Sequence, residues 1–315
     1  MINRLHLLVL AVAGLLSWSV SSSAAPFAYV PNEGSGTVSV IDTAIDRVVA
    51  DIPAGKKPRG LAVSGDWLYV SDQPNNRLQM IDLKKRQSGA TIALGESPEG
   101  VYASPDGRWI AAAIEESNDV AIVDTQTQQL AFTIKVHGRN PEHAVFSPDG
   151  KKLFVSAEEG EAVDIIDLAT REQVAQIPVG ARPRGIGFLP DSSRAYVATE
   201  NSDEVYVIDA VANKLITHFK AGRRANGVTV HPDGSKVYIS NGAEASVSVI
   251  DTADNKIVAT IAVGQRPWNM AITPDGKKLY VANGRSNSVS VIDTMRNLKV
   301  RDISVGKLPW GVVIN

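Results

Sequence analysis

The sequence predicts an all-β protein folded as a seven-bladed β-propeller, and three observations support this. The pattern Val-x-Val-Ile-Asp, or a close variant, recurs 40 to 43 residues apart, and each copy ends in an aspartate. A glycine, usually followed three residues later by proline, recurs in step with it, and the residues between alternate between apolar and polar. The aspartates are Asp42, Asp82, Asp124, Asp167, Asp209, Asp251 and Asp293, and the glycines are Gly55, Gly95, Gly138, Gly180, Gly222, Gly264 and Gly306. A repeat of this length made of short strands is typical of propellers.

Within one repeat, four short strands are predicted. In residues 267–306 the apolar alternation covers 268–272, 278–282, 288–292 and 300–305, and polar turns containing Pro, Asp, Gly or Asn separate these runs. Alternation with a period of two residues, bounded by turn residues, is the signal of antiparallel strands. No segment shows helical periodicity, so each repeat is expected to form one four-stranded blade.

The two ends of the propeller are predicted to share a blade. Residues 27–30 match the second strand of the repeat, and residues 309–314 match its first strand. The C-terminal strand should therefore complete the blade that begins at the N-terminus, which removes an exposed sheet edge. Residues 26–315 are expected to form a single domain.

Residues 1–25 are predicted to be a secretory signal peptide. Arg4 precedes a mostly apolar run over 5–16, and small residues follow up to Ala24 and Ala25, where cleavage is expected. This predicts a periplasmic or secreted protein. The alternative is a segment retained as a membrane anchor, for which the apolar run is short.

Composition narrows the function classes. Lys and Arg total 32 against 34 Asp and Glu, so no overall basic field favours nucleic acid. The absence of cysteine excludes disulfides, thiolate metal sites and a cysteine nucleophile.

The repeats resemble the YVTN type of propeller repeat. The resemblance rests on Val70, residues 155–156, residues 197–201 and the Tyr-Val-Ala-Asn of 280–283, each followed by the Asp-terminated strand, and it covers essentially the whole of 26–315. The closing segments 264–268, 284–287 and 306–311 are also similar to β-propeller proteins associated with catabolism dependent on pyrroloquinoline quinone (PQQ).

That narrower resemblance implies an accessory role in periplasmic alcohol oxidation. Its implied partners are a quinoprotein dehydrogenase, a cytochrome or a transport component, and its implied ligand is PQQ or a related quinone. Quinoprotein relatives of this fold bind PQQ with features that include adjacent cysteines, which this chain lacks. The chain is therefore not expected to be the dehydrogenase itself, and no resident cofactor is predicted.

The candidate binding site is the mouth of the central channel. The first strand of each repeat lines the channel, and its opening residues differ between repeats whereas the flanking Gly and Pro recur. We expect these exposed positions to bind a ligand or partner, together with two neighbours: Arg59, Glu99, Glu142, Arg184, Asn226, Trp268 and Trp310, with His143 and Arg266.

The charged residues and the tryptophans around the mouth can each be interpreted in two ways. A cationic arc (Lys56, Lys57, Arg59, Arg182, Arg184, Arg223, Arg224, Arg266, Lys307) faces acidic positions (Glu96, Glu99, Glu115, Glu116, Glu142, Glu158, Glu159, Glu200, Asp203, Glu204). This suggests either a dipolar face that captures a small anion or a charged partner, or loops charged for solubility. Trp268 and Trp310, beside Arg266, either stack a planar anion or plug the channel.

No catalytic or metal-binding motif is present. Glu142 and His143 form the one histidine site at the mouth, and a metal there would need Glu99 or Glu116 from another blade; the alternative is a solvated histidine. The repeated aspartates and the Pro-Asp-Gly aspartates are expected to close turns. Trp67 and Trp109, after the Pro-Asp-Gly position, are expected to be structural.

Three functions follow, in order of preference. The first is a non-enzymatic binding or scaffold propeller serving PQQ-dependent oxidation. The second is an enzyme using the central funnel, either a lactonase-like hydrolase or an amine-dehydrogenase-type subunit. The third is nucleic-acid binding, ranked last because acidic residues interrupt the cationic arc and the sequence pI is about 6.2.

Overall fold

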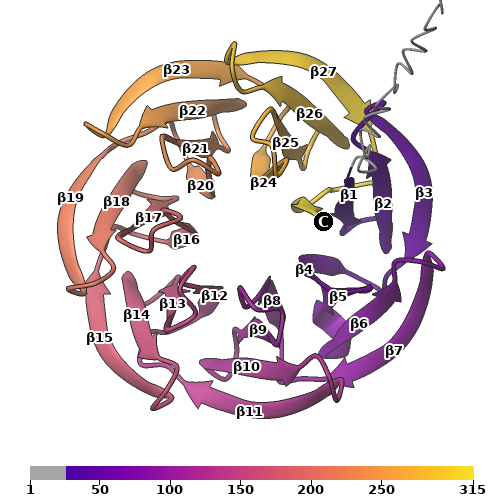
Figure 1. Ribbon diagram of the computed structural model, residues 1–315, viewed down its shortest axis with the longest axis horizontal. Helices are drawn as coiled ribbons and strands as arrows, with labels where there is room; N and C mark the ends of the chain where they lie inside the picture. Colours follow the sequence, from indigo (N-terminus) through magenta and orange to yellow (C-terminus); the bar gives the residue numbers. More distant parts are fainter. Residues whose placement is uncertain (1–25) are drawn as a thin grey trace, which may run out of the picture.

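Seven four-stranded antiparallel sheets stand radially around a central axis in the computed structural model, which describes residues 26–315 (Figure 1). The predicted seven-bladed propeller is confirmed. The predicted signal peptide, residues 1–25, lies outside the described residues.

The chain builds the blades in order, each from the axis outward. Blade 1 contains β28 (Val313–Ile314), β1 (Phe27–Asn32), β2 (Thr37–Asp42) and β3 (Arg47–Pro53). Blade 2 contains β4 (Pro58–Ser64), β5 (Trp67–Asp72), β6 (Arg77–Asp82) and β7 (Gln87–Ala93). Blade 3 contains β8 (Pro98–Ala103), β9 (Trp109–Ile114), β10 (Asp119–Asp124) and β11 (Gln129–Lys135).

The remaining blades repeat this arrangement. Blade 4 contains β12 (Pro141–Phe146), β13 (Lys152–Ala157), β14 (Ala162–Asp167) and β15 (Glu172–Pro178). Blade 5 contains β16 (Pro183–Phe188), β17 (Arg194–Thr199), β18 (Glu204–Asp209) and β19 (Lys214–Lys220). Blade 6 contains β20 (Ala225–Val230), β21 (Lys236–Asn241), β22 (Ser246–Asp251) and β23 (Lys256–Ala262). Blade 7 contains β24 (Pro267–Ile272), β25 (Lys278–Asn283), β26 (Ser288–Asp293) and β27 (Leu298–Ser304).

The ring is closed by the C-terminal strand, as the sequence predicts. Tyr29 of β1 pairs with Val313 of β28, and an isolated bridge joins Asn32 to Pro309. The paired strand is shorter than the predicted 309–314. Because β28 occupies the innermost place of blade 1, all seven blades have four strands and no inner edge of blade 1 is left open.

Aspartate side chains close the turns, which confirms their predicted structural role. Asp209 Oδ1 accepts hydrogen bonds from the backbone N–H groups of Val211 and Ala212, at 3.0 and 2.8 Å. Asp275 Oδ1 accepts from the N–H of Lys277 and the hydroxyl of Thr273. Such bonds let a short polar side chain satisfy the turn's backbone donors without help from another blade.

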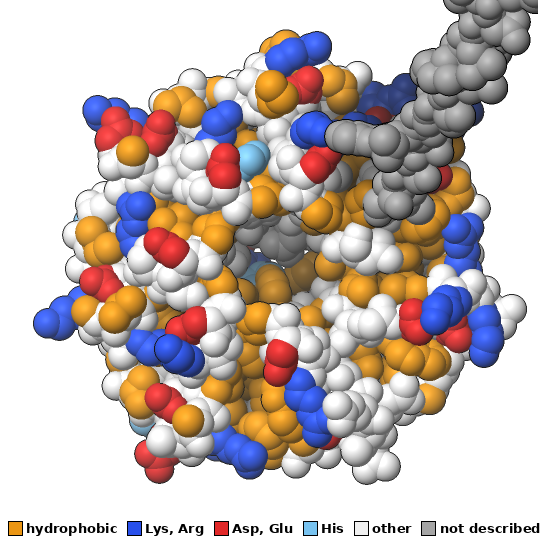
Figure 2. All heavy atoms as spheres, in the orientation of Figure 1, with side chains coloured by type: hydrophobic (Ala, Val, Ile, Leu, Met, Phe, Trp, Pro, Cys, Tyr) orange, Lys and Arg blue, Asp and Glu red, His pale blue; other side chains and the backbone are white. Residues whose placement is uncertain are grey.

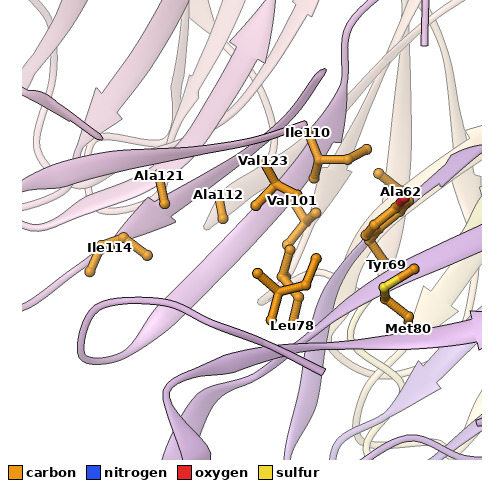
Figure 3. Close-up of a cluster of buried hydrophobic side chains, with 11 residues drawn as sticks. Ala62, Tyr69, Leu78, Met80, Val101, Ile110, Ala112, Ile114, Ala121 and Val123 are labelled. Atoms are coloured by element: carbon orange, nitrogen blue, oxygen red, sulfur yellow. The ribbon is translucent and has the colours of Figure 1, made fainter. Parts of the chain in front are cut away.

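The hydrophobic core lies between neighbouring blades. Figure 3 shows one such layer, in which Tyr69 and Leu78 of blade 2 lie near Val101 and Ile110 of blade 3. All four side chains are buried. The two middle strands of each blade contribute to such layers on both faces, which explains why most of their burial patterns are nearly continuous rather than alternating. The blades are therefore held by side-chain packing against their neighbours.

One short helix interrupts this pattern within residues 26–315, the 3₁₀ turn η1 (Gln73–Asn75). No helix in that range is long and apolar enough to cross a membrane. Hydrophobic side chains surround the channel opening on the face drawn in Figure 2, and charges of both signs are scattered around it.

Candidate functional site

The mouth residues stand on β-bulges. Arg59, Glu99, Glu142, Arg184 and Trp268 are each the second residue of an innermost strand, and the pairing register with the next strand shifts at that point in every case. Asn226 of β20 occupies the same place in blade 6. A bulge re-aims the side chain that it carries. The repeat thus presents an unequal set of side chains at one end of the channel from an otherwise uniform scaffold.

In blades 2, 3, 5 and 6 a close contact between neighbouring innermost strands follows the mouth residue. A Cβ added to Gly60 would lie 2.2 Å from the carbonyl oxygen of Glu99, and one added to Gly227 would lie 2.5 Å from that of Trp268. Glycine is required where backbones approach this closely. Blades 4 and 7 carry His143 and Asn269 at this position instead, so these two side chains enter the axial region where the other blades have none.

On one side of the mouth, Arg59 joins two carboxyl groups. Its guanidinium lies 2.5 Å from Glu99 Oε1 and 3.0 Å from Glu33 Oε2. The amide of Gln73 also donates to Glu99. The Glu99 side chain is fully buried beneath Arg59. Arg59 therefore separates this carboxyl group from the solvent at the mouth.

On the other side, Arg184 is the centre of a larger network. Its guanidinium contacts Glu142 and lies 3.0 Å from both Glu158 and Glu200. These three glutamates come from β12, from the β13–β14 loop and from the β17–β18 loop, so one arginine connects blades 4 and 5. Arg182 reinforces the link, 2.6 Å from Glu158.

Glu200 is the acceptor that gathers most of these arginines. Its buried carboxylate lies 3.0 Å from Arg184, 2.6 Å from Arg266, 3.3 Å from Arg224 and 3.4 Å from Arg182. The contact with Arg266 crosses from blade 5 to blade 7. One carboxylate thus holds guanidinium groups from three blades in a single arrangement.

These contacts correct three expectations. The cationic arc and the acidic loops do not form a dipolar face, because Arg59, Arg182, Arg184, Arg224 and Arg266 pair with the acidic residues across blades. The loops are not charged merely for solubility either, since the carboxylate of Glu200 is buried and Glu158 and Glu200 pair with arginines of the mouth. The mouth positions are also less exposed than expected: the side chains that neighbouring blades contribute bury Glu99, Glu142, Asn226 and Trp310.

His143 is neither solvated nor part of a metal-binding group in the described part of the chain. Its Nδ1 shares a 2.8 Å hydrogen bond with the hydroxyl of Tyr102, and its ring lies 5.7 Å from that of Trp310. Burial lowers the pKa of His143 to about 4, so the imidazole is neutral at physiological pH. No cluster of three or more His, Asp or Glu within residues 26–315 could hold a metal ion.

Burial changes the titration of the carboxyl groups. Burial, reinforced by the charge of Glu142, raises the pKa of Glu99 to about 8 against the opposing effect of Arg59. Burial likewise raises the pKa of Glu158 to about 7, and this side chain shares a hydrogen bond with Glu142. Although burial opposes it, the charge of Arg184 holds the pKa of Glu142 below its usual range. Burial thus favours the protonated forms of Glu99 and Glu158, whereas Arg184 favours the charged form of Glu142.

A polar cavity of about 290 Å³ opens at this mouth. Its lining includes Arg59, Gln73, Glu115, Glu142, Glu158, Arg182, Arg184, Asn226, Arg266, Trp268, Asn269 and Trp310. The guanidinium of Arg266 lies 5.9 Å from the ring centre of Trp268. Four guanidinium groups and three carboxyl groups line this cavity, and the carboxylate of Glu200 contacts three of the same arginines from outside the lining.

A second, largely apolar cavity of about 350 Å³ lies deeper in the channel. Val63, Val101 and Val312 are in its lining, and Trp310 and Asn269 line both cavities. Trp310 is buried, so it partly plugs the channel, whereas Trp268 keeps a partly exposed ring at the polar cavity. The plugging interpretation thus describes Trp310, and the stacking of a planar anion on Trp268 stays a prediction.

All nine predicted site residues gather at this end of the channel. Seven of them line the polar cavity, and Glu99 and His143 lie behind Arg59 and Trp310. The sequence did not single out Glu200, Glu158 and Arg182 as site residues, although it placed them in the charged loops. Tyr102 was missed, and its position three residues after Glu99 on a channel strand was the available signal.

The fold and this mouth define a seven-bladed propeller with a charged axial pocket. A family model described as YNCE-like beta-propeller matches residues 8–315, and the chain belongs to that family. No curated protein sequence matches the chain.

Solved structures share the fold at low sequence identity. A chain from hydrazine synthase of Kuenenia stuttgartiensis is 21% identical, with a TM-score of 0.79 over 90% of this chain and 99% of that one. A protein of unknown function from Desulfotomaculum acetoxidans is 17% identical, with a TM-score of 0.81 over 91% and 98%. A candidate 6-phosphogluconolactonase from Bacteroides uniformis is 20% identical, with a TM-score of 0.76 over 92% and 100%. At these identities the likeness concerns the fold alone.

Proposed function

We propose that this chain is an exported, non-enzymatic binding propeller that holds a small planar anion at the channel mouth, in the service of PQQ-dependent alcohol oxidation. The observation that carries the proposal is the polar cavity. Four guanidinium groups and the partly exposed ring of Trp268 line it, so donors for carboxylates and an aromatic face lie in one small space.

PQQ suits this cavity chemically. It is a planar quinone with three carboxylates, and arginine forks recognise carboxylates through paired hydrogen bonds while aromatic faces stack planar rings. A cavity of about 290 Å³ is also close to the lower end of the usual range for small-molecule sites. The predicted signal peptide and the resemblance of the closing repeat to PQQ-associated propellers support the same compartment and system.

The test of ligand binding is calorimetric titration of the purified protein with PQQ. We expect saturable binding that weakens with added salt, and a loss of roughly tenfold or more in affinity in Arg182→Gln and in Trp268→Ala. Arg223→Gln is the matched control, because Arg223 pairs with Glu244 outside the cavity. No binding, or equal binding by all variants, would exclude the mouth as a PQQ site.

The proposed partner and compartment need a separate experiment. The tagged protein would be isolated from the periplasmic fraction of its native host grown on an alcohol. Recovery of a quinoprotein dehydrogenase, a cytochrome or a transport component is expected. Retention of the chain in the cytoplasm would contradict the proposed export, and isolation without any of these components would contradict the accessory role.

A second candidate, a lactonase-like hydrolase, is favoured by one observation. Glu99, whose pKa burial raises to about 8, lies beside Arg59 directly behind the polar cavity, so its proton could reach a substrate only through the arginine that covers it. Turnover of a lactone or ester that is lost in Glu99→Gln would support this function over simple binding. No turnover across a panel of lactones and esters would exclude it.

A further inference from the structure

The contact between two neighbouring blades, called a seam here, is built in two ways: a cation-closed seam has a lysine or arginine at one position, and an aromatic seam has a phenylalanine or tryptophan there. The two kinds of seam differ in the first residue of the second strand of each blade. In blades 4 to 7 this residue is Lys152, Arg194, Lys236 or Lys278, and each donates to a backbone carbonyl of the outer turn of the next blade. In blades 1 to 3 the same position holds Phe27, Trp67 and Trp109.

At the seam between blades 3 and 4 the substitution is accompanied by a cavity of about 690 Å³. Trp109 and Phe132 of blade 3 face Phe146 and Leu168 of blade 4 across it. The rings of Trp109 and Phe132 lie 5.8 Å apart in an edge-to-face arrangement, and both are partly exposed. Figure 2 shows hydrophobic side chains over the strands of blade 3 on the face drawn. The volume and the aromatic walls are those of a small-molecule site.

The charges around this cavity differ in how they are partnered. Asp106 and Asp149 accept hydrogen bonds within their own turns, and Asp167 caps the turn that follows it. Arg171 stacks its guanidinium 3.9 Å from the ring centre of Phe132, and its side chain has no hydrogen bond or ion pair with any residue from 26 to 315. The five N–H donors of this guanidinium are therefore available to a ligand.

We propose that this seam, independently of the channel mouth, is a binding site for a small aromatic carboxylate. The aromatic ring of the ligand stacks among Trp109, Phe132 and Phe146, and its carboxylate pairs with Arg171. A carboxylate suits the site better than a cation, because Lys151 of the lining pairs with Asp149, whereas Arg171 covers one face of Phe132 and has no polar partner among residues 26–315. This site lies beside the outer strand β11, away from the axial cavities, and the two linings share no residue.

The test is calorimetric titration with 3-phenylpropionate, its neutral amide and 3-phenylpropylamine. We expect the carboxylate to bind and the amide and amine to bind at least tenfold more weakly. Arg171→Gln should remove most of this preference, because a charge-assisted pair is replaced by a neutral contact. Arg86→Gln is the matched control: Arg86 occupies the corresponding turn position in blade 2, where it lies over Phe27, and its loss should leave binding unchanged.

A second variant tests the cavity itself. Trp109→Lys installs the type of residue that blades 4, 6 and 7 carry and can fold with the bond to the neighbouring turn that those blades make. It should abolish binding while the thermal unfolding curve stays cooperative. Stronger binding of the amine, unchanged carboxylate preference in Arg171→Gln, or unchanged affinity in Trp109→Lys would overturn the proposal; the last result would mean binding elsewhere on the surface. PQQ binding at the mouth should be unaffected by both variants, which separates the two proposals.

Discussion

At the channel mouth and at the seam between blades 3 and 4, residues differ from those at the equivalent positions of the other blades. The two regions differ in whether the charged side chains find partners. At the mouth, residues from several blades converge and the charges neutralise one another, as Glu200 does with the surrounding arginines. At the seam, only two blades meet, and replacing a lysine-type contact by Trp109 leaves a cavity and an arginine without a polar partner. The same kind of sequence variation thus produces a cross-linked network at the axis and an open site at the periphery.

The largest effect is expected from removing the centre of the mouth network. Glu200→Ala leaves buried guanidinium groups of Arg184 and Arg266 without this carboxylate, and breaking a buried ion pair costs about 3–5 kcal/mol. Urea unfolding should show that loss in the free energy of unfolding. Glu96→Ala, an exposed glutamate near the same face, should change it by less than about 0.5 kcal/mol. Equal effects of the two substitutions would contradict the idea of a network centred on Glu200.

A smaller effect is expected at the seam between blades 4 and 5, where a lysine bonds to the outer turn of the next blade. Lys152→Met removes the bonds from its ammonium to the carbonyl oxygens of Ala210 and Val211 and to the side chain of Asn213, at 2.6, 3.1 and 2.6 Å. Because hydrogen bonds from a charged group contribute about 1.5–3 kcal/mol, the free energy of unfolding should fall by about that amount.

The neighbouring Lys151→Met is the control for the cation-closed seam. Lys151 is exposed and pairs only with the aspartate of its own turn. Equal losses in the free energy of unfolding for the two lysine variants would contradict a stabilising role for the lysine that bonds to the next blade.

The last effect concerns the pH dependence of stability. The raised pKa values of Glu99, about 8, and Glu158, about 7, mean that the folded protein binds more protons than the unfolded chain between about pH 5 and 8. This contribution to stability is present below the unfolded pKa and is lost as the pH rises through the folded values, with a slope of at most about 1.4 kcal/mol per pH unit for each proton. Glu99→Gln should flatten the decline between pH 6 and 8.

The low pKa of His143 acts in the opposite sense at acid pH. Its contribution is present above the unfolded pKa and is lost as the pH falls toward about 4. Glu99→Gln should leave this loss of stability at acid pH unchanged. A decline above pH 6 identical to that of the unmodified protein would show that Glu99 is not the group that titrates.

The architecture could be predicted from the sequence because it depends on local and repeated signals. Turn aspartates, glycines and alternating strands act within a few residues of one another. Because the repeat occurs seven times, a strand that is poorly marked in one copy is identified from the others. Even ring closure was determined in this way, since residues 27–30 and 309–314 each match only part of a repeat. The position of the mouth followed from the same logic, as the place where equivalent residues differ.

Only the tertiary structure decided what those unequal residues do. Glu200 and Arg266 are 66 residues apart, and their contact depends on how blades 5 and 7 face each other across the axis. The protonation of Glu99 likewise depends on its burial beneath Arg59, which no spacing in the sequence reveals. Trp109 was expected to be structural, and its place beside a cavity became visible only when the neighbouring blade was present. Strand pattern is a local property, whereas charge pairing, burial and cavities arise between segments that are distant in the chain.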